Sequence, residues 1–271
     1  MAGTAPEESA WLLVEYAGPW GRKAVAESRL PERVRELLGG LGDVRVQLIR
    51  RHGGESGPGV RVFAAHLGGR PRVWTTVLDD VAELCDLRLD DPAAEPRFTT
   101  HDGPLWLVCT NGRRDLCCAE AGRPIARALS ERWPEATWET THLGGHRFSG
   151  TLLALPSGVA LGRLDAGSAV DACAGLEAGR LPARSVRGRA GLSTAAQVAE
   201  LHVRAELGLD RLGEVSVEPL ADGTVAVTAG GETRLLTVTA TRGEARRQSC
   251  ADLKTKPGWV YDVVTSVPLP T

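Results

Sequence analysis

The segment LWLVCTNGRRDLCCAEAGRPIARALSERWPEATWETT, residues 105–141, decides the fold. Its first six residues, LWLVCT, are mostly apolar and predict a strand, and its last six, ATWETT at 136–141, predict a second strand. Residues 111–118 between them are polar and predict a loop, and residues 119–133 predict a helix. The order strand, helix, strand indicates an α/β protein.

Working outward, residues 148–164 predict a hairpin that turns at residues 156–158, and residues 168–179 and 193–208 predict helices. The last part, with apolar alternation at 214–220, 224–230, 232–241 and 259–267, predicts a β-rich C-terminal tail. Upstream, a strand at 11–17, a helix at 30–42 and strands at 44–51, 60–67 and 72–80 repeat the order strand, helix, strand, hairpin. We therefore hypothesise that residues 10–80 and 104–165 are two related β-α-β-β units, the alternative being a chance likeness of two short strands.

The stretch RLDDPAAEPRFTTHDGP, residues 88–104, is rich in Pro and Asp and is the candidate boundary between domains. It divides the chain into an N-terminal α/β unit at residues 1–100 and a second domain at residues 101–271 that includes the β-rich extension. A length of 271 residues suits two small domains.

Composition excludes several classes of protein. The formal net charge is −2, so no general basic field draws the chain to nucleic acid or to anionic lipid. The start, MAGTAPEESA, lacks the basic and apolar parts of a signal peptide, and no apolar run approaches the roughly 20 residues of a membrane span. We therefore expect a cytoplasmic protein. In the reducing cytosol, its six cysteines are expected to be free thiols or metal ligands and not a disulfide framework.

Metal-ligand side chains are concentrated in one part of the chain: Cys109, Cys117, Cys118, His142 and His146. The cysteines surround the loop after the strand at 105–110, and the histidines follow the next strand. In a β-α-β unit these loops lie at the same end of the sheet, so they can converge. The phrase HLGGH at 142–146 has paired glycines, which favour a tight loop over a helix and let the backbone approach a bound group closely.

A near copy of this phrase, HLGGR, occupies residues 66–70. It has Arg70 in place of the second histidine, and the preceding loop of the first unit has no cysteine. We expect a structural role for His66 and interpret the first unit as a scaffold that keeps the turn without the chemistry.

Thiolate and imidazole ligands suit zinc, copper or an iron–sulfur cluster. Structural zinc usually takes its cysteines from a C-x2–4-C knuckle, whereas eight residues separate Cys109 from Cys118. A [2Fe–2S] cluster with two cysteines on one iron and two histidines on the other matches the ligand set. Zinc and the absence of any metal are the alternatives, and spacing alone does not exclude Cys117 as a ligand.

The phrase CTNGRRDLCCA, followed by HLGGHRFSGTLLALPSGVALGRL, resembles the sucrase/ferredoxin-like family, and the resemblance runs from residue 11 to about residue 163. That family includes thioredoxin-like [2Fe–2S] proteins with bis-histidinyl ligation and the pattern C-x8-C followed by H-x3-H. The resemblance implies a thioredoxin-like ferredoxin domain whose cluster is held by Cys109, Cys118, His142 and His146, with Cys117 a bystander.

Neutral imidazoles in place of two thiolates make the oxidised cluster formally neutral, so its reduction potential should rise above that of an all-cysteine cluster. The second ring nitrogen of each histidine can titrate, which predicts coupling of electron and proton transfer. We expect an electron carrier that acts between a reductase and an unknown acceptor, and not an enzyme with its own substrate. A homodimer is compatible with this role. A redox or pH sensor, a cluster-delivery protein and a zinc-stabilised interaction module are the alternatives, and no persuasive carboxylate pair marks a glycosidase.

Five residues are predicted to surround the ligands: Arg114, Asp115, Gly144, Gly145 and Arg147. Asp115 stands where a helix cap belongs, or it orients an arginine. Arg147 directly follows a ligand, where its charge can raise the potential or help to dock an acidic partner.

Three further cysteines carry no ligand spacing. Cys85 and Cys173 lie in apolar helical contexts and are predicted to be core thiols. Cys250 lies in the polar segment RRQSCADLK and is interpreted as an incidental surface cysteine.

Overall fold

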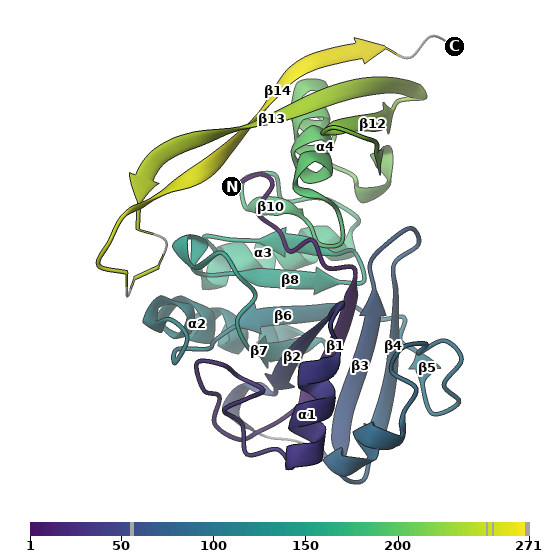
Figure 1. Cartoon of the computed structure of the whole chain (residues 1–271), viewed down its shortest axis with the longest axis vertical. Coiled ribbons are helices and arrows are strands. Elements are labelled where there is room, and N and C mark those ends of the chain that lie inside the picture. Colours follow the sequence, from purple (N-terminus) through teal and green to yellow (C-terminus); the bar gives the residue numbers. More distant parts are fainter. Residues whose placement is uncertain (55–56, 248, 251, 269–271) are drawn as a thin grey trace.

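The computed structural model describes residues 1–54, 57–247, 249–250 and 252–268. A curled sheet of ten strands fills the lower part of the molecule, and a separate four-stranded antiparallel sheet lies above it against a helix (Figure 1). The α/β class and the β-rich C-terminal part predicted from the sequence are both confirmed.

The N-terminal half contributes one side of the large sheet. Its elements are β1 (Ala10–Glu15), α1 (Glu32–Gly40), β2 (Val44–Arg50), the 3-10 turn η1 (His52–Gly54), β3 (Val60–His66), β4 (Arg72–Leu78), the 3-10 helix η2 (Val81–Asp86) and the short β5 (Thr99–Thr100). Strand β1 pairs with β2 in parallel and with β3 in antiparallel fashion, and β3 pairs with β4. The strand order is therefore β2-β1-β3-β4-β5.

The second half repeats this arrangement. Its elements are β6 (Leu105–Cys109), α2 (Leu116–Arg132), β7 (Thr137–Thr140), the 3-10 turn η3 (His146–Phe148), β8 (Leu152–Leu155), β9 (Val159–Leu161), α3 (Ala166–Glu177) and β10 (Val186–Arg189). Strand β6 pairs in parallel with β7 and in antiparallel fashion with β8, which pairs with β9. The order β7-β6-β8-β9 thus matches β2-β1-β3-β4 strand for strand, which agrees with the thioredoxin-like expectation; the proposed duplication and domain boundary stay predictions.

The two halves share one sheet because β7 pairs with β2 in antiparallel fashion. The equivalence of strands changes the interpretation of the two HLGG phrases. HLGGR at 66–70 forms the turn between β3 and β4, whereas HLGGH at 142–146 lies between β7 and β8. Because these are different positions in the repeated order, Arg70 does not stand where His146 stands, and that part of the sequence interpretation was wrong.

The central strands are buried on both faces, which explains their continuous apolar runs. In β6, the side chains of Leu107 and Cys109 join the core inside the curl, and those of Trp106 and Val108 pack on the opposite face with α2 and α3. Successive side chains of a strand point to opposite faces, so one short run supplies both cores. Each such fully buried side chain contributes about 1.5–3 kcal/mol to folding.

The C-terminal part is built on α4 (Thr194–Leu207), the 3-10 turn η4 (Leu212–Glu214), β11 (Val215–Pro219), β12 (Thr224–Ala229), β13 (Glu232–Arg246) and β14 (Lys256–Pro268). One face of α4 packs on this sheet in a small apolar core of its own. The long hairpin of β13 and β14 extends past the N-terminus of the chain and over the side of the large sheet (Figure 1).

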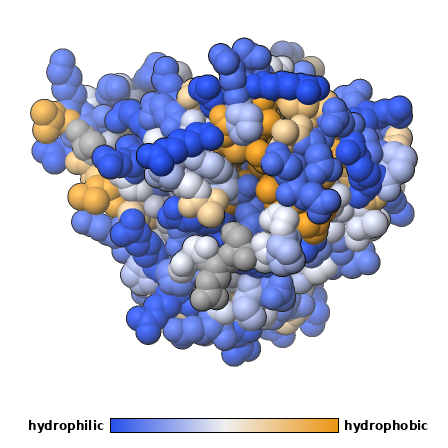
Figure 2. All heavy atoms as spheres, turned by 90° about the horizontal axis from the view of Figure 1, so that it is seen from below, coloured by the Kyte–Doolittle hydropathy of each residue, from blue (hydrophilic) through white to orange (hydrophobic). Residues whose placement is uncertain are grey.

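The surface seen from below is mostly hydrophilic, with a larger hydrophobic area right of centre and smaller ones at the left edge (Figure 2). No helix in the described ranges is long and apolar enough to cross a membrane.

Candidate metal centre

Three elements deliver the predicted ligands to one place. Strand β6 ends at Cys109, and α2 begins at Leu116, which puts Cys118 in its first turn. The loop after β7 carries His142 and His146. Because β6 and β7 are parallel, their carboxyl ends lie at the same edge of the sheet. The convergence expected from the β-α-β order is present.

The ligand atoms lie close together. The sulfur atoms of Cys109 and Cys118 are each 3.8 Å from Nδ1 of His142, and the three atoms all lie within 4.8 Å of one another. The ring of His146 stacks on that of His142, with the centroids 3.9 Å apart and an angle of 12° between the planes. Two sulfurs and one imidazole therefore form a compact group, and the second imidazole lies one ring farther out.

The pKa values of the Cys109 and Cys118 thiols shift in opposite directions. The hydrogen bond from the Cys118 thiol lowers the pKa of Cys109 well below its usual value, and the nearby His142 and the backbone N–H of Leu143 act in the same direction. The same hydrogen bond and burial raise the pKa of Cys118. Cys109 is therefore the more acidic thiol of the pair, and a cation bound between the two sulfurs would displace the proton that they share.

The loop between the histidines depends on both glycines. Gly144 and Gly145 have φ angles of 86° and 74°, in the left-handed region that favours glycine. A Cβ atom on Gly145 would also lie 2.5 Å from a guanidinium nitrogen of Arg187. The tight loop predicted from the sequence is present, and it leads directly into the 3-10 turn η3 that begins at His146.

Arg187 is a site residue that sequence reasoning missed. Its side chain donates to the carbonyl oxygen of Gly144 at 3.2 Å and to the backbone of Thr4, and only 2% of the residue is exposed. Burial lowers the pKa of this guanidinium to about 10, and the Cys109 thiolate acts in the opposite direction. Arg187 lies in β10, more than 40 residues beyond the loop, and no local pattern marks it.

Asp115 is neither a helix cap nor an arginine partner. It occupies the N-cap position of α2, but its side chain makes no capping hydrogen bond. Instead its Oδ2 lies 3.4 Å from Nδ1 of His146, and neither of these buried atoms has a hydrogen-bond partner in the described part of the chain. Burial acts to raise the pKa of Asp115, and hydrogen bonds from Cys250, Ser249 and Cys117 outweigh it, so the pKa is lowered.

Cys117 lies outside the group of Cys109, Cys118 and His142. Its sulfur is 3.4 Å from Oδ1 of Asp115, and burial raises the pKa of its thiol to about 11. Cys117 therefore lies beside the group, and the bystander role that the resemblance implies stays a prediction.

Cys250 is an exposed surface cysteine, as predicted, but it is not isolated. The Cys250 sulfur accepts a hydrogen bond from the backbone N–H of Cys117 at 3.4 Å, and its thiol donates to the carboxylate of Asp115. The ligand atoms of Asp115, Cys117 and Cys250 lie within 4.8 Å of one another and form a second small group. The connection between β13 and β14 is thereby attached to the start of α2.

Cys173 is buried in the core as predicted, whereas Cys85 is half-buried against the core beside α1.

The two predicted arginines differ in their positions. Arg114 is half-buried, and its backbone N–H donates to the side chain of Asn111 at 3.2 Å. Burial and the neighbouring His142 lower the pKa of His146 most, and the charge of Arg114 adds to this effect. Arg147 is exposed and its guanidinium lies over the ring of Phe148 at 4.6 Å. The charge of Arg114 therefore acts on the outer histidine, whereas that of Arg147 lies over Phe148.

The donor set fits a soft metal centre. Two sulfurs and two imidazoles are ligands typical of iron–sulfur and zinc sites. Asp115 lies 3.4 Å from Nδ1 of His146, so a proton held at Nδ1 would leave Nε2 of that ring as the metal-binding atom, as is usual for a metal-bound histidine. His142 lies with the two sulfurs, and His146 stacks on its outer side.

Comparison with protein families matches residues 1–174 to a family described as sucrase/ferredoxin-like. The chain belongs to the sucrase/ferredoxin-like family. The match includes both halves of the large sheet as far as α3, and thus every predicted ligand, whereas Arg187 and Cys250 lie beyond it. Comparisons with curated proteins and with solved structures gave no match.

Proposed function

We propose that this member of the sucrase/ferredoxin-like family binds a [2Fe–2S] cluster through Cys109, Cys118, His142 and His146 and carries single electrons between a reductase and an acceptor. The observation that carries the proposal is the convergence of two sulfurs and an imidazole nitrogen within 4.8 Å, with a second imidazole stacked on the first. A bound cluster would supply reversible one-electron chemistry.

The surrounding residues support this role. Cys109 and Cys118 are buried and hold the inner side of the site, whereas His142 and His146 face outward and are half-buried. Electron transfer to a partner needs such a combination, because the inner ligands exclude water and the outer ones bring the site near the surface. The buried positive charge of Arg187 favours the reduced, more negative state of the site.

Asp115 would hold the proton on Nδ1 of His146, from which it lies 3.4 Å away. This arrangement fixes the ring orientation and offers a group whose protonation can follow the redox state. The same feature favours a second candidate function, a redox or pH sensor, because a histidine that is partly exposed and beside a carboxylate is a ligand that protonation can release.

The test is the visible absorption spectrum of protein purified without oxygen, with iron and sulfide analysis and with two matched variants. Cys118→Ser should lose the visible absorption, and Cys117→Ser, one residue away, should keep it, because Cys118 lies with Cys109 and His142 whereas Cys117 lies with Asp115. Stoichiometric zinc in a colourless protein would replace the cluster proposal with a zinc-stabilised module. Retained absorption in Cys118→Ser would show that the ligand assignment is wrong.

Clean redox cycling at mildly acidic pH, measured by spectra before and after repeated cycles, would favour the carrier. Loss of the cluster during such cycling would favour the sensor.

A further inference from the structure

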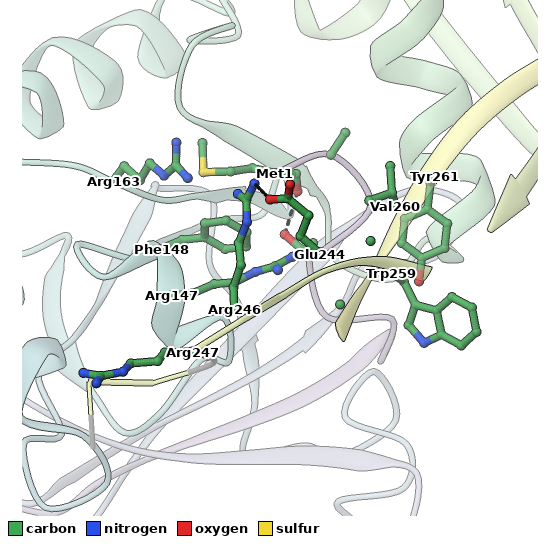
Figure 3. Close-up of a pocket in the computed structure, with 14 residues that line it drawn as sticks. Met1, Arg147, Phe148, Arg163, Glu244, Arg246, Arg247, Trp259, Val260 and Tyr261 are labelled. Carbon is green, nitrogen blue, oxygen red and sulfur yellow. Dashed lines mark hydrogen bonds and ion pairs between the residues drawn. The ribbon is translucent and has the colours of Figure 1, made fainter. Parts of the chain in front are cut away.

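A cavity of about 460 Å³ opens between the loop after His146 and the hairpin of β13 and β14. Figure 3 shows Arg147, Phe148 and Arg163 on one side of it and Trp259 and Tyr261 on the other. A second cavity of about 360 Å³ shares Arg147 and Phe148 in its lining and reaches His146. Volumes of this size are typical of small-molecule sites.

Three guanidinium groups surround one aromatic ring in this place. Those of Arg147, Arg163 and Arg187 lie 4.6, 5.5 and 5.7 Å from the centroid of Phe148. Three positive charges around a single ring repel one another, and the electron-rich ring face offsets only part of that repulsion. None of the three has a carboxylate partner in the described part of the chain.

The cavity wall supplies few negative charges to compensate. Among the described residues that line it, Glu244 is the one carboxylate, and it is already paired with Arg246 at 3.0 Å. Arg247 is a further cation of the same wall. The cavity therefore has a positive excess that an anion from solution would neutralise.

The backbone holds these cations in place. Arg163 has a φ angle of 59°, which is uncommon for a residue other than glycine, and its N–H donates to the carbonyl oxygen of Phe148 at 3.0 Å. A Cβ atom on Gly258 of β14 would lie 2.9 Å from a guanidinium nitrogen of Arg147, so this arginine fits against a strand that has no side chain there. The buried Arg187 is fixed by Thr4 and Gly144 and supplies a constant charge behind the other two.

We propose that this cavity binds a small molecule with at least two anionic groups, phosphate or carboxylate. Arg147 and Arg163 would make the direct contacts, because both are exposed and the planar guanidinium matches either group in a bidentate manner. Such a ligand would sit one residue from His146. The inference goes beyond the proposed electron transfer and concerns binding alone.

The test is isothermal titration calorimetry of the whole chain at 150 mM salt, with inorganic pyrophosphate as the phosphate probe and citrate as the carboxylate probe. Binding of either probe, weakened about tenfold or more in Arg163→Gln and in Arg147→Gln, is the expected result, since a charge-assisted hydrogen bond contributes about that factor. Binding of one probe and not the other would identify the preferred anionic group.

The matched control is Arg127→Gln, which removes an equally charged side chain from the exposed face of α2, where it pairs with Glu131. It should bind as the unaltered chain does. No binding of either probe, or equal binding by all three variants, would overturn the proposal. Calorimetry needs no iron, so this outcome is distinct from a failure to find the cluster.

Discussion

Gly122 controls how closely α2 approaches the end of β6. A Cβ atom at this position would lie 2.1 Å from the carbonyl oxygen of Cys109, which is nearer than any real contact. Helix and strand could not then keep their present distance, and the displaced group would be the residue that carries a predicted ligand. The absence of a side chain at Gly122 therefore supports both the packing of α2 and the position of the Cys109 sulfur.

We expect Gly122→Ala to lower the free energy of unfolding by about 1–3 kcal/mol, despite the better helix propensity of alanine, because overpacking forces the backbone apart. Chemical denaturation measures this change. Gly39→Ala is the matched control, since Gly39 is also helical and a Cβ atom there meets nothing within 4 Å. Equal stability of the two variants would contradict the close approach of α2 to Cys109.

At the scale of elements, the junction of β2 and β7 joins the two halves through a short ladder. Its register has two residue pairs, Ile49 with Thr140 and Arg50 with Glu139. Side chains reinforce it, because the buried carboxylate of Glu139 accepts from Arg50 at 2.9 Å and lies 2.8 Å from Nδ1 of His52. The ion pairs and hydrogen bonds of Glu139 thus supplement the two-residue ladder between β2 and β7.

Glu139→Gln should weaken this junction by on the order of 2 kcal/mol, because it leaves Arg50 without its charged partner. Burial acts to raise the pKa of Glu139, but the bonds to His52 and Arg50 outweigh it and lower the pKa below 4.5. The stabilisation is therefore complete above pH 4.5 and is lost as the pH falls through the lower, folded-state pKa. Unfolding curves at several pH values measure it.

The variant should lose this part of the acid dependence, so its stability should converge with that of the unaltered chain at low pH. Glu131→Gln, which removes an exposed carboxylate paired with Arg127, should leave both the stability near neutral pH and its acid dependence almost unchanged. A constant difference between Glu139→Gln and the unaltered chain at every pH would contradict the assignment.

Local patterns predicted the elements well, because strands such as β1 and β6 are apolar on both faces and the helices have clear periodicity or composition. They could not predict the junction of β2 with β7, since the register there depends on Arg50 and Glu139, which are nearly 90 residues apart. They also misled at HLGGR: four shared letters make a turn in both places, but turn sequence does not determine which strands the turn connects.

At the scale of the whole molecule, the candidate ligands were predictable and their surroundings were not. The four candidate ligands lie in one β-α-β segment and the loop that follows it, where topology brings loops together. Arg187 in β10 contacts the loop of the two histidines, and Cys250, between β13 and β14, contacts the start of α2. Both contacts join segments that are distant in the sequence, so they form only when the chain folds. Neither has a sequence signal, because a single arginine or cysteine in a polar segment is ordinary.

Cys250 attaches the long β13–β14 hairpin to the centre, and this attachment is testable. In Cys250→Ser the shorter, less polarisable side chain should weaken the bonds to Cys117 and Asp115, so the amide of Cys117 should exchange its hydrogen faster. Hydrogen exchange followed by mass spectrometry of the peptides around residues 116–118 and 249–250 measures this. The cause is local, so the apolar core of α4 with its sheet should keep its protection.

Leu253→Ser is the matched control for that experiment, because Leu253 lies in the same connection between β13 and β14 and is 90% exposed. It shortens a side chain of the same segment without touching α2, so protection of residues 116–118 should stay as in the unaltered chain. Faster exchange in both variants would mean that the connection as a whole, and not the Cys250 sulfur, holds the hairpin. Unchanged exchange in Cys250→Ser would mean that the hairpin is held over the centre by its other contacts, such as that of Gly258 with Arg147.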